Sequence, residues 1–380
     1  MYKMAVKMRK VVIASDSFKG CLSSAEVARA AGMGVLDVCP GCEVVSLAVA
    51  DGGEGTVDAL AATLGARIRR VEVSGPLGRR VIAEYAIAPD GTAVIEMAKA
   101  SGLTLLSPDE RNPLAATTYG TGELVADALD KGCRRFLICI GGSATNDAGT
   151  GALEALGYVF TDAEGRRLKG CGESLGKIAD VDTTGADPRL KESHFIVACD
   201  VDSPFCGPEG AAYVYAPQKG ATPEMVATLD EGMRSFSRII YKVTGMDVTD
   251  IAGAGAAGGL GGALKAFLKA EMSPGAAMVL DAVGFDEAIK GADLVITGEG
   301  RMDAQTITGK LPYTVAQRAS ARGVPVIAIC GRSEVDALRY FKTICQVTPS
   351  DMPLAEALRP DTASLNIRTA IAKTIKKEAD

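Results

Sequence analysis

Five short apolar runs in the sequence are each followed directly by a loop that carries carboxylate, hydroxyl or cationic side chains. The runs are KVVIAS (10–15), VVSLAV (44–49), FLICIGG (136–142), FIVAC (195–199) and DLVIT (293–297). Any single loop of this kind could be a structural turn in which Asp or Ser caps the next helix. Capping is the better interpretation for one or two of the loops, but it does not explain polar residues at the same place in all five.

The residue types in these loops match the requirements of phosphoryl transfer. The stretch GGSATNDAGTGALEAL (141–156) places small residues and backbone N–H groups where a helix begins, which is a ready anion site. Lys19 and Arg301 could neutralise the oxygens of a transferring phosphate, and the carboxylates could hold Mg²⁺ with retained waters. The chain has a single histidine, His194, with no motif around it. An Asp would therefore have to orient or deprotonate the acceptor hydroxyl.

These considerations assign a candidate role to each loop residue. The candidate catalytic residues are Lys19, Asp51, Asp147, Asp200 and Arg301. The candidate residues for binding substrate or phosphate are Asp16, Ser17, Gly52, Gly53, Ser143, Thr145, Asn146, Gly255 and Gly258. The candidate Mg²⁺ ligands are Glu54, Asp202, Glu299 and Asp303. For Asp147, helix capping is an equally good interpretation.

The familiar nucleotide-binding motifs are missing or out of context. The nearest approach to a P-loop, TGKLP (308–312), lacks the first Gly and the Ser or Thr, which excludes that motif. Residues 253–258 spell GxGxxG, but the preceding MDVTDIA (246–252) makes a poor buried strand, so the Rossmann context fails. These glycines are better explained as positions where a helix terminus approaches phosphate or another backbone closely.

The elements that position the loops follow from the hydrophobic pattern. Apolar runs that alternate with helical patterns predict parallel α/β architecture, whose ligand sites lie at the carboxyl ends of the strands. Segments 67–97 instead alternate polar and apolar residues between PLG and PDG turns, which predicts an antiparallel meander and a domain boundary near residues 64–68. Helices are expected at about 24–38, 57–64, 223–243 and 263–271, and from about 312.

The late apolar runs look like the first two. We therefore expect two α/β domains, in which both ends of the chain (1–66 and 286–380) form one parallel-sheet domain around an inserted mixed α/β domain (67–285). The active site is expected in the cleft between them.

Composition narrows the classes of function. The formal net charge of −6 argues against an extended footprint on nucleic acid. No apolar run reaches the length of a membrane span, and the opening MYKMAVKMRK lacks the features of a signal peptide, so a cytoplasmic protein is expected. The ten cysteines are expected to be reduced. The CPGC sequence (39–42) is better explained by a turn than by redox chemistry.

Six motifs, in order and spread over nearly the whole chain, resemble the bacterial glycerate kinase family, which yields phosphoglycerate. The chain departs from the family pattern at Ser15, where Pro is common, and at Ala148, where Gly is common. Both changes are small and concern loop shape. The motifs are IASDSFKGCLSSAEVA (13–28), VADGGEGTVDAL (49–60), GGSATNDAGTGALEALG (141–157), CDVDSPFCGPEGAAYVYAPQKGA (199–221), GAGAAGGLGGAL (253–264) and ADLVITGEGRMDAQTITGK (292–310).

The resemblance implies a flavodoxin-like or Rossmann-like domain, ATP and Mg²⁺ as co-substrate and cofactor, and D-glycerate as the acceptor. It favours transfer to the 2-hydroxyl, although nothing in the residues excludes the 3-hydroxyl. The expected assembly is a monomer or homodimer. Two other functions stay open at this point: an NAD-dependent hydroxy-acid dehydrogenase, suggested by GxGxxG, and a non-catalytic sensor of an acid or nucleotide.

Overall fold

The computed structural model describes residues 8–53, 55–303, 306, 309–334 and 339–379. The chain divides into two compact units. Unit 1 falls within Met1–Asp51, Asp58–Leu64 and Ala276–Asp380, and unit 2 comprises Gly52–Val57 and Gly65–Gly275. Among the described residues, no helix is both long enough and apolar enough to cross a membrane.

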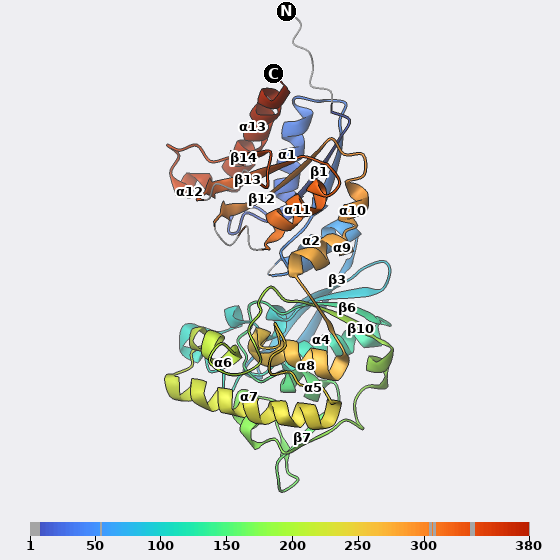
Figure 1. The fold of residues 1–380 in the computed structure, drawn as a ribbon, viewed down its shortest axis with the longest axis vertical. Helices are drawn as coiled ribbons and strands as arrows, with labels where there is room; N and C mark the ends of the chain where they lie inside the picture. Colours follow the sequence, from blue (N-terminus) through green and yellow to red (C-terminus); the bar gives the residue numbers. More distant parts are fainter. Residues whose placement is uncertain (1–7, 54, 304–305, 307–308, 335–338, 380) are drawn as a thin grey trace, which may run out of the picture. The chain divides into compact units, whose positions relative to one another are not determined.

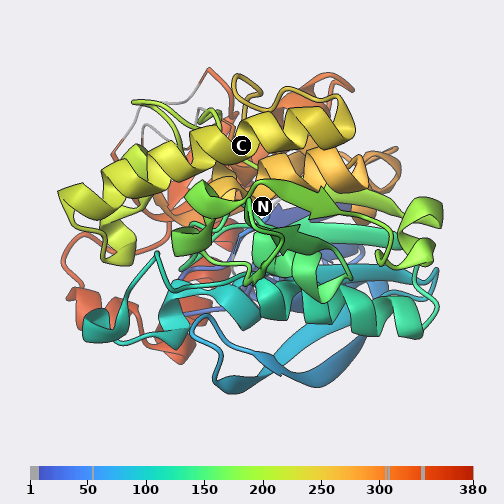
Figure 2. The ribbon, with the colours of Figure 1, turned by 90° about the horizontal axis from the view of Figure 1, so that it is seen from below.

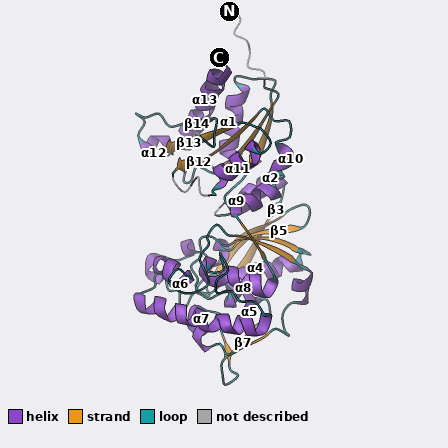
Figure 3. Ribbon diagram, viewed as in Figure 1, coloured by secondary structure: helices purple, strands orange, loops and turns teal. Residues whose placement is uncertain are grey.

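Unit 1 is a five-stranded parallel sheet with the order β14-β13-β12-β1-β2 (Figures 1 and 3). Counted within this sheet, the order is 2-1-3-4-5, which is the flavodoxin-like arrangement. The order confirms the predicted parallel sheet built from both ends of the chain. The strands are β1 (Lys10–Ser15), β2 (Glu43–Ala48), β12 (Leu294–Met302), β13 (Val326–Ser333) and β14 (Thr343–Gln346).

Helices cover both faces of this sheet. Val11 and Ile13 belong to one buried cluster with α1 and α13, whereas Val12, on the other side of the pleat, is buried outside that cluster. On that second side, α11 contacts β12 and β13. A capping box between Ser23 and Glu26 starts α1. The helices of unit 1 include α1 (Ser24–Leu36), α2 (Thr56–Leu64), α9 (Gly275–Ala282), α10 (Phe285–Ala288), α11 (Leu311–Ser320), α12 (Leu354–Ala357) and α13 (Pro360–Ala379).

Unit 2 contains a six-stranded mixed sheet with the order β11-β10-β6-β5-β4-β3. The first three strands in sequence form the predicted antiparallel meander, and β5, β6, β10 and β11 are parallel. These four parallel strands therefore bring their carboxyl ends to one edge. The strands are β3 (Arg67–Ser74), β4 (Arg80–Ile87), β5 (Thr92–Glu96), β6 (Arg135–Cys139), β10 (His194–Ala198) and β11 (Glu271–Ser273), and a separate small sheet contains β7 (Val159–Thr161), β8 (Arg167–Leu168) and β9 (Asp180–Asp182).

The longest helix of unit 2, α7 (Pro223–Thr244), lies along its surface (Figure 2). Thr222 caps its first turn, and Gly245 ends it in the left-handed conformation at φ 75°. Leu229, Met233 and Phe236 recur on its buried face at helical spacing. The other helices are α3 (Ala98–Ser101), α4 (Tyr119–Asp130), α5 (Thr150–Ala155), α6 (Ala211–Tyr215) and α8 (Leu260–Leu268).

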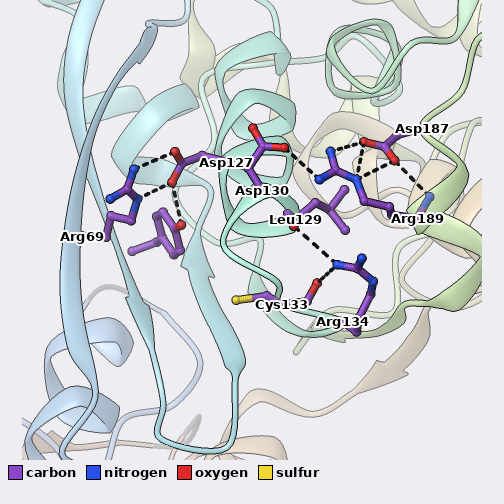
Figure 4. A network of polar contacts seen from close by, with 9 residues as sticks. Arg69, Asp127, Leu129, Asp130, Cys133, Arg134, Asp187 and Arg189 are labelled. Atoms are coloured by element: carbon purple, nitrogen blue, oxygen red, sulfur yellow. Dashed lines mark hydrogen bonds and ion pairs between the residues drawn. The ribbon is translucent and has the colours of Figure 1, made fainter.

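The carboxyl-terminal part of α4 is anchored by two carboxylates (Figure 4). Asp127 accepts two hydrogen bonds from Arg69 on β3, at 2.5 and 2.9 Å, and a third from the Tyr85 hydroxyl on β4 at 2.6 Å. Asp130 pairs with Arg189 at 2.8 Å. These contacts fix α4, whose other end meets the GGSATND loop of the candidate site.

The predicted helix over 263–271 is wrong at its carboxyl end. α8 ends at Leu268, because Lys269 takes a left-handed conformation with φ 56° and Ala270 donates its N–H back to the Leu264 carbonyl. Glu271 then starts β11, which pairs in parallel with β10. The pairing adds a fourth parallel strand to the edge that carries the loops of unit 2.

Candidate active site

In unit 1, the candidate residues lie at the point where the strand order reverses. From β1 the chain crosses to β2 on one side, while β12 lies on the other side. Such a switch point in an open α/β sheet is where ligands bind. The loop after β1 is joined to β12, because Asp16 N–H donates to the Gly298 carbonyl at 2.9 Å and the Ser15 hydroxyl donates to the same oxygen at 3.0 Å. β12 continues to Met302, so Glu299 and Arg301 lie on the strand itself and not, as predicted, in a loop after it.

Asp16 is a buried carboxyl that faces two other acids. Its side chain is 6% exposed, and its own Oδ1 accepts a hydrogen bond from Ser17 N–H at 2.6 Å. Burial raises the pKa of Asp16 to about 7, and the negative charges of Asp51 and Glu299 add to the increase, while Ser17 N–H and Lys19 oppose it. Three acidic side chains therefore interact electrostatically: Asp16 after β1, Asp51 after β2 and Glu299 on β12.

Glu299 is linked to the loop that follows β12. The Thr306 hydroxyl donates to Glu299 Oε1 at 2.5 Å, and Asp303 N–H donates to the same hydroxyl oxygen at 3.0 Å. Lys310 Nζ lies 3.8 Å from Glu299 Oε2. Burial raises the pKa of Glu299, whereas Thr306 and Lys310 lower it. Sequence reasoning missed Lys310, although it ends the motif ADLVITGEGRMDAQTITGK.

The two basic side chains that are candidates for binding phosphate, Lys19 and Arg301, have different surroundings. Lys19 is exposed and close enough to Asp16 to lower its pKa. Arg301 is also exposed and pairs with Glu334 at 2.6 Å, so it holds a surface carboxylate in this structure. Glu54, a candidate Mg²⁺ ligand, lies outside the described residues.

Unit 2 gathers a second set of candidates at the edge formed by its parallel strands. Asp200 follows β10 and accepts a hydrogen bond from Gly275 N–H at 2.8 Å, while Asp202 is exposed two residues later. Gly52 has φ +86°, and a Cβ there would lie 2.5 Å from the Gly275 Cα, so this position requires glycine. Gly53 accepts a 2.8 Å hydrogen bond from the Thr56 hydroxyl.

Asp147 is fully buried and organises the loop around it. One carboxylate oxygen accepts hydrogen bonds from Thr118 N–H (2.7 Å), the Thr118 hydroxyl (2.8 Å) and Gly151 N–H (3.2 Å), and the other accepts from Gly149 N–H (3.1 Å). Burial raises the pKa of Asp147, and these four donors oppose the increase. The contacts favour the capping interpretation of Asp147 over a direct catalytic role.

Replacing Asp147 by Asn is expected to destabilise the protein by about 2–3 kcal/mol, because an amide nitrogen would replace one of two oxygens that both accept hydrogen bonds. Urea unfolding measures this change. The matched control is Asp182→Asn, since Asp182 is exposed and accepts its hydrogen bonds locally, from Thr184. Equal stability of the two variants would contradict the role of Asp147.

The remaining loop residues surround a lysine that sequence reasoning did not single out. Lys219 donates from Nζ to the Ser143 hydroxyl oxygen at 2.8 Å and to the Thr145 carbonyl at 2.7 Å. Thr145 and Asn146 are fully buried, and each has a side-chain oxygen without a hydrogen-bond partner among the described residues. The motif CDVDSPFCGPEGAAYVYAPQKGA contains Lys219, but nothing local in the sequence marks it as buried.

The glycines of GxGxxG pack against other loops. Gly258 has φ +66°, and a Cβ there would collide with the Thr145 carbonyl oxygen and lie 2.5 Å from the Asn146 Cα. A Cβ on Gly255 would collide with the Pro204 carbonyl oxygen. Residues 246–252, which precede the motif, form no strand. Close approach to backbone therefore accounts for both glycines, and the Rossmann context is absent from this part of the described chain.

The acidic side chains near Asp16 can be compared with the ligands that Mg²⁺ requires. Within the described residues, no three His, Cys, Asp or Glu side chains are grouped so that they could hold a metal by themselves. A Mg²⁺ that keeps waters and bridges phosphate oxygens needs only one or two carboxylates. The mutual repulsion of Asp16, Asp51 and Glu299 suits a cation delivered with a nucleotide.

Comparison with known proteins gives consistent matches over most or nearly all of the chain. Residues 11–377 match the model described as "Glycerate kinase family". The chain is 46% identical to "Glycerate kinase" of Bacillus subtilis, with 97% of this chain and 98% of the relative covered. It is 49% identical to "Glycerate 2-kinase" of Escherichia coli, with 85% of each covered. A crystal structure of a putative glycerate kinase 2 from Salmonella typhimurium LT2 superposes with a TM-score of 0.91 at 44% identity, covering 98% of both chains.

Proposed function

Because the chain belongs to the glycerate kinase family, we propose that it transfers the γ-phosphoryl group of ATP to D-glycerate, with the 2-hydroxyl as the favoured acceptor. The observation that carries the proposal is similarity over nearly the entire chain to relatives with this activity in their names. A cytoplasmic location and a monomeric or homodimeric state are part of the same proposal.

The carboxylates of unit 1 are proposed to receive the nucleotide phosphates. Phosphoryl transfer depends on positioning and on neutralising charge that builds up on phosphate oxygens. Mg²⁺, when bound, would supply that neutralisation, and Asp16, Asp51 and Glu299, with Asp303 near Glu299, are proposed to hold it. The pKa of Asp16 supports this role, because a cation is what would keep so buried a carboxyl ionised.

Lys19 and Arg301 are proposed to bind the same phosphates directly. Lys19 already acts electrostatically on Asp16. Arg301 would exchange its exposed pairing with Glu334 for a phosphate oxygen, which costs little because exposed ion pairs are weak. Asp200 is proposed to orient or deprotonate the acceptor hydroxyl. Ser17, Gly52 and Gly53 would approach the ligands through short side chains or bare backbone.

The reaction can be tested by coupling ADP production to a spectrophotometric readout. With MgATP, D-glycerate should be phosphorylated much faster than glycerol, because the carboxylate offers a charge that the site can fix and glycerol lacks it. Phosphorus and proton NMR of the product should place the phosphate on the 2-oxygen. Equal rates with glycerol and glycerate would contradict the proposal. Nicotinamide absorbance with glycerate serves as the control for a dehydrogenase.

A further inference from the structure

Lys219 is a buried cation to which the proposed reaction assigns no role. It lies at the end of the short 3-10 helix Pro217–Lys219, and its side chain is 2% exposed. Burial lowers the pKa of Lys219 to about 7, while the negative charge of Asp147 opposes the decrease. A buried lysine costs free energy unless its hydrogen bonds and nearby charges compensate. Its two hydrogen bonds both go to the GGSATND loop.

The segment that carries Lys219 is fixed by its neighbours. Gly220 has φ +91°, and a Cβ there would lie 2.5 Å from the Arg111 carbonyl oxygen and 2.8 Å from the Arg111 Cβ. Lys219 N–H donates to the Ala216 carbonyl at 3.0 Å. The ammonium group therefore enters the loop from a backbone held in place on both sides of the residue.

The hydrogen bond to Ser143 determines what that hydroxyl can do. In its charged form Lys219 can only donate hydrogen bonds, so Ser143 Oγ is then the acceptor of the 2.8 Å bond. The hydroxyl hydrogen of Ser143 must then point away from Lys219. Ser143 itself is 8% exposed, its Oγ has no second hydrogen-bond partner in the described parts of the chain, and Gly141 and Gly142 just before it are exposed. Ser143 is left as a donor at the carboxyl end of β6.

We propose that Lys219 is a positioning residue, which holds the 141–147 loop and turns the Ser143 hydroxyl outward to donate a hydrogen bond to the carboxylate of the acceptor substrate. This inference rests on the proposed glycerate kinase function. A carboxylate fits better than the nucleotide phosphates, because Lys219 is buried against the loop through Ser143 and Thr145, and the Ser143 hydroxyl is a single neutral donor that suits a small monoanion. The clustered acids that suit metal-bound phosphates belong to unit 1.

The test compares Michaelis constants in the full-length protein. Ser143→Ala should raise KM for D-glycerate about 10-fold or more, as expected for a lost hydrogen bond to a charged group, with KM for ATP unchanged. Lys219→Met should raise KM for glycerate at least as much. The double variant should be no worse than Lys219→Met alone, because both changes remove one contact. Ser143→Thr keeps the hydroxyl and should restore most of the affinity.

Ser237→Ala is the matched control, because Ser237 is also buried in unit 2 but donates to the Arg234 carbonyl within α7. It should leave both Michaelis constants unchanged. An unchanged KM for glycerate in folded Ser143→Ala, or additive effects in the double variant, would overturn the inference while wild-type activity still upheld the proposed function. A wild-type protein inactive on glycerate would overturn both. If Lys219→Met does not fold, the Ser143 variants decide the matter.

Discussion

Replacing Asp16 by Asn is expected to lower turnover about 100- to 1,000-fold and, at the same time, to make the protein more stable at pH 8. The loss of activity is the size expected when a preorganised charged group is removed from a reaction site. The gain in stability follows from burial, because a neutral amide in the same place avoids the cost of a buried charge near Asp51 and Glu299.

The direction of the stability change in Asp16→Asn follows from how the protonation of Asp16 depends on pH. The pKa of Asp16 is about 7 in the folded protein and about 3.9 in an unfolded chain. Between these pH values the folded state binds more protons, so the contribution of Asp16 to stability falls as the pH rises through that window. The Tm of Asp16→Asn should therefore exceed that of the wild type at pH 8, and the difference should shrink toward pH 4.

Calorimetry at several pH values measures this difference, and the ADP assay measures the turnover. Asp351→Asn is a suitable control, because Asp351 is exposed in the same unit. It should change neither the turnover nor the pH dependence of the Tm. Near-normal turnover of Asp16→Asn at ordinary Mg²⁺ concentrations would show that the acids of unit 1 are structural, and a lower Tm at pH 8 would show that Asp16 stabilises the fold as an anion.

Replacing Gly258 by Ala is expected to destabilise the protein by about 3 kcal/mol. Part of this cost comes from the left-handed conformation at φ +66°, and part from the collision of the new Cβ with the backbone of Thr145 and Asn146. Relief of the collision requires the 145–148 segment to move, because Ala148 N–H also donates to the Gly258 carbonyl at 2.9 Å. The Gly258→Ala variant should also have a higher KM for glycerate.

Gly245→Ala separates the two contributions. Gly245 has a similar φ of +75°, but a Cβ there would meet no atom within 4 Å. Its substitution should cost only about 1 kcal/mol and leave the kinetics unchanged. Denaturant unfolding of both variants tests the difference, and equal destabilisation would show that conformation alone, not the approach of the two loops, requires Gly258.

Much of the fold can be predicted from the sequence, because it depends on local pattern. The apolar runs locate the starts of β1, β2, β6, β10 and β12 to within a residue or two, and polar alternation predicts the meander of β3–β5. β11 was missed, because a three-residue strand after a left-handed Lys269 carries almost no local signal. Whether Asp147 caps or reacts also depends on a distant residue, Thr118, which no local motif reveals.

The candidate site is predictable to a smaller extent. Parallel strands bring their carboxyl ends to one edge, which is why Asp16 and Glu299 could be expected together in unit 1. Lys219 could not be found this way. It follows a helix rather than a strand, and its burial depends on tertiary packing around the 143–147 loop. A lysine in PQKGA looks like any exposed turn residue until the loop that covers it is known.

The layout of unit 1 also has a consequence during synthesis on the ribosome. In the sheet, β1 lies between β2, which follows it closely in the sequence, and β12, which is far away in the sequence. The Ser15 hydroxyl at the end of β1 donates to the Gly298 carbonyl of β12, and these two residues are 283 positions apart in the chain. Translation proceeds from the amino terminus, so β1 and β2 emerge long before β12 is made, and β1 must wait with an unpaired edge. Unit 2, almost all of it in one continuous stretch, can finish folding in that interval. Until β12 is made, that edge of β1 is therefore open to pairing with a wrong strand.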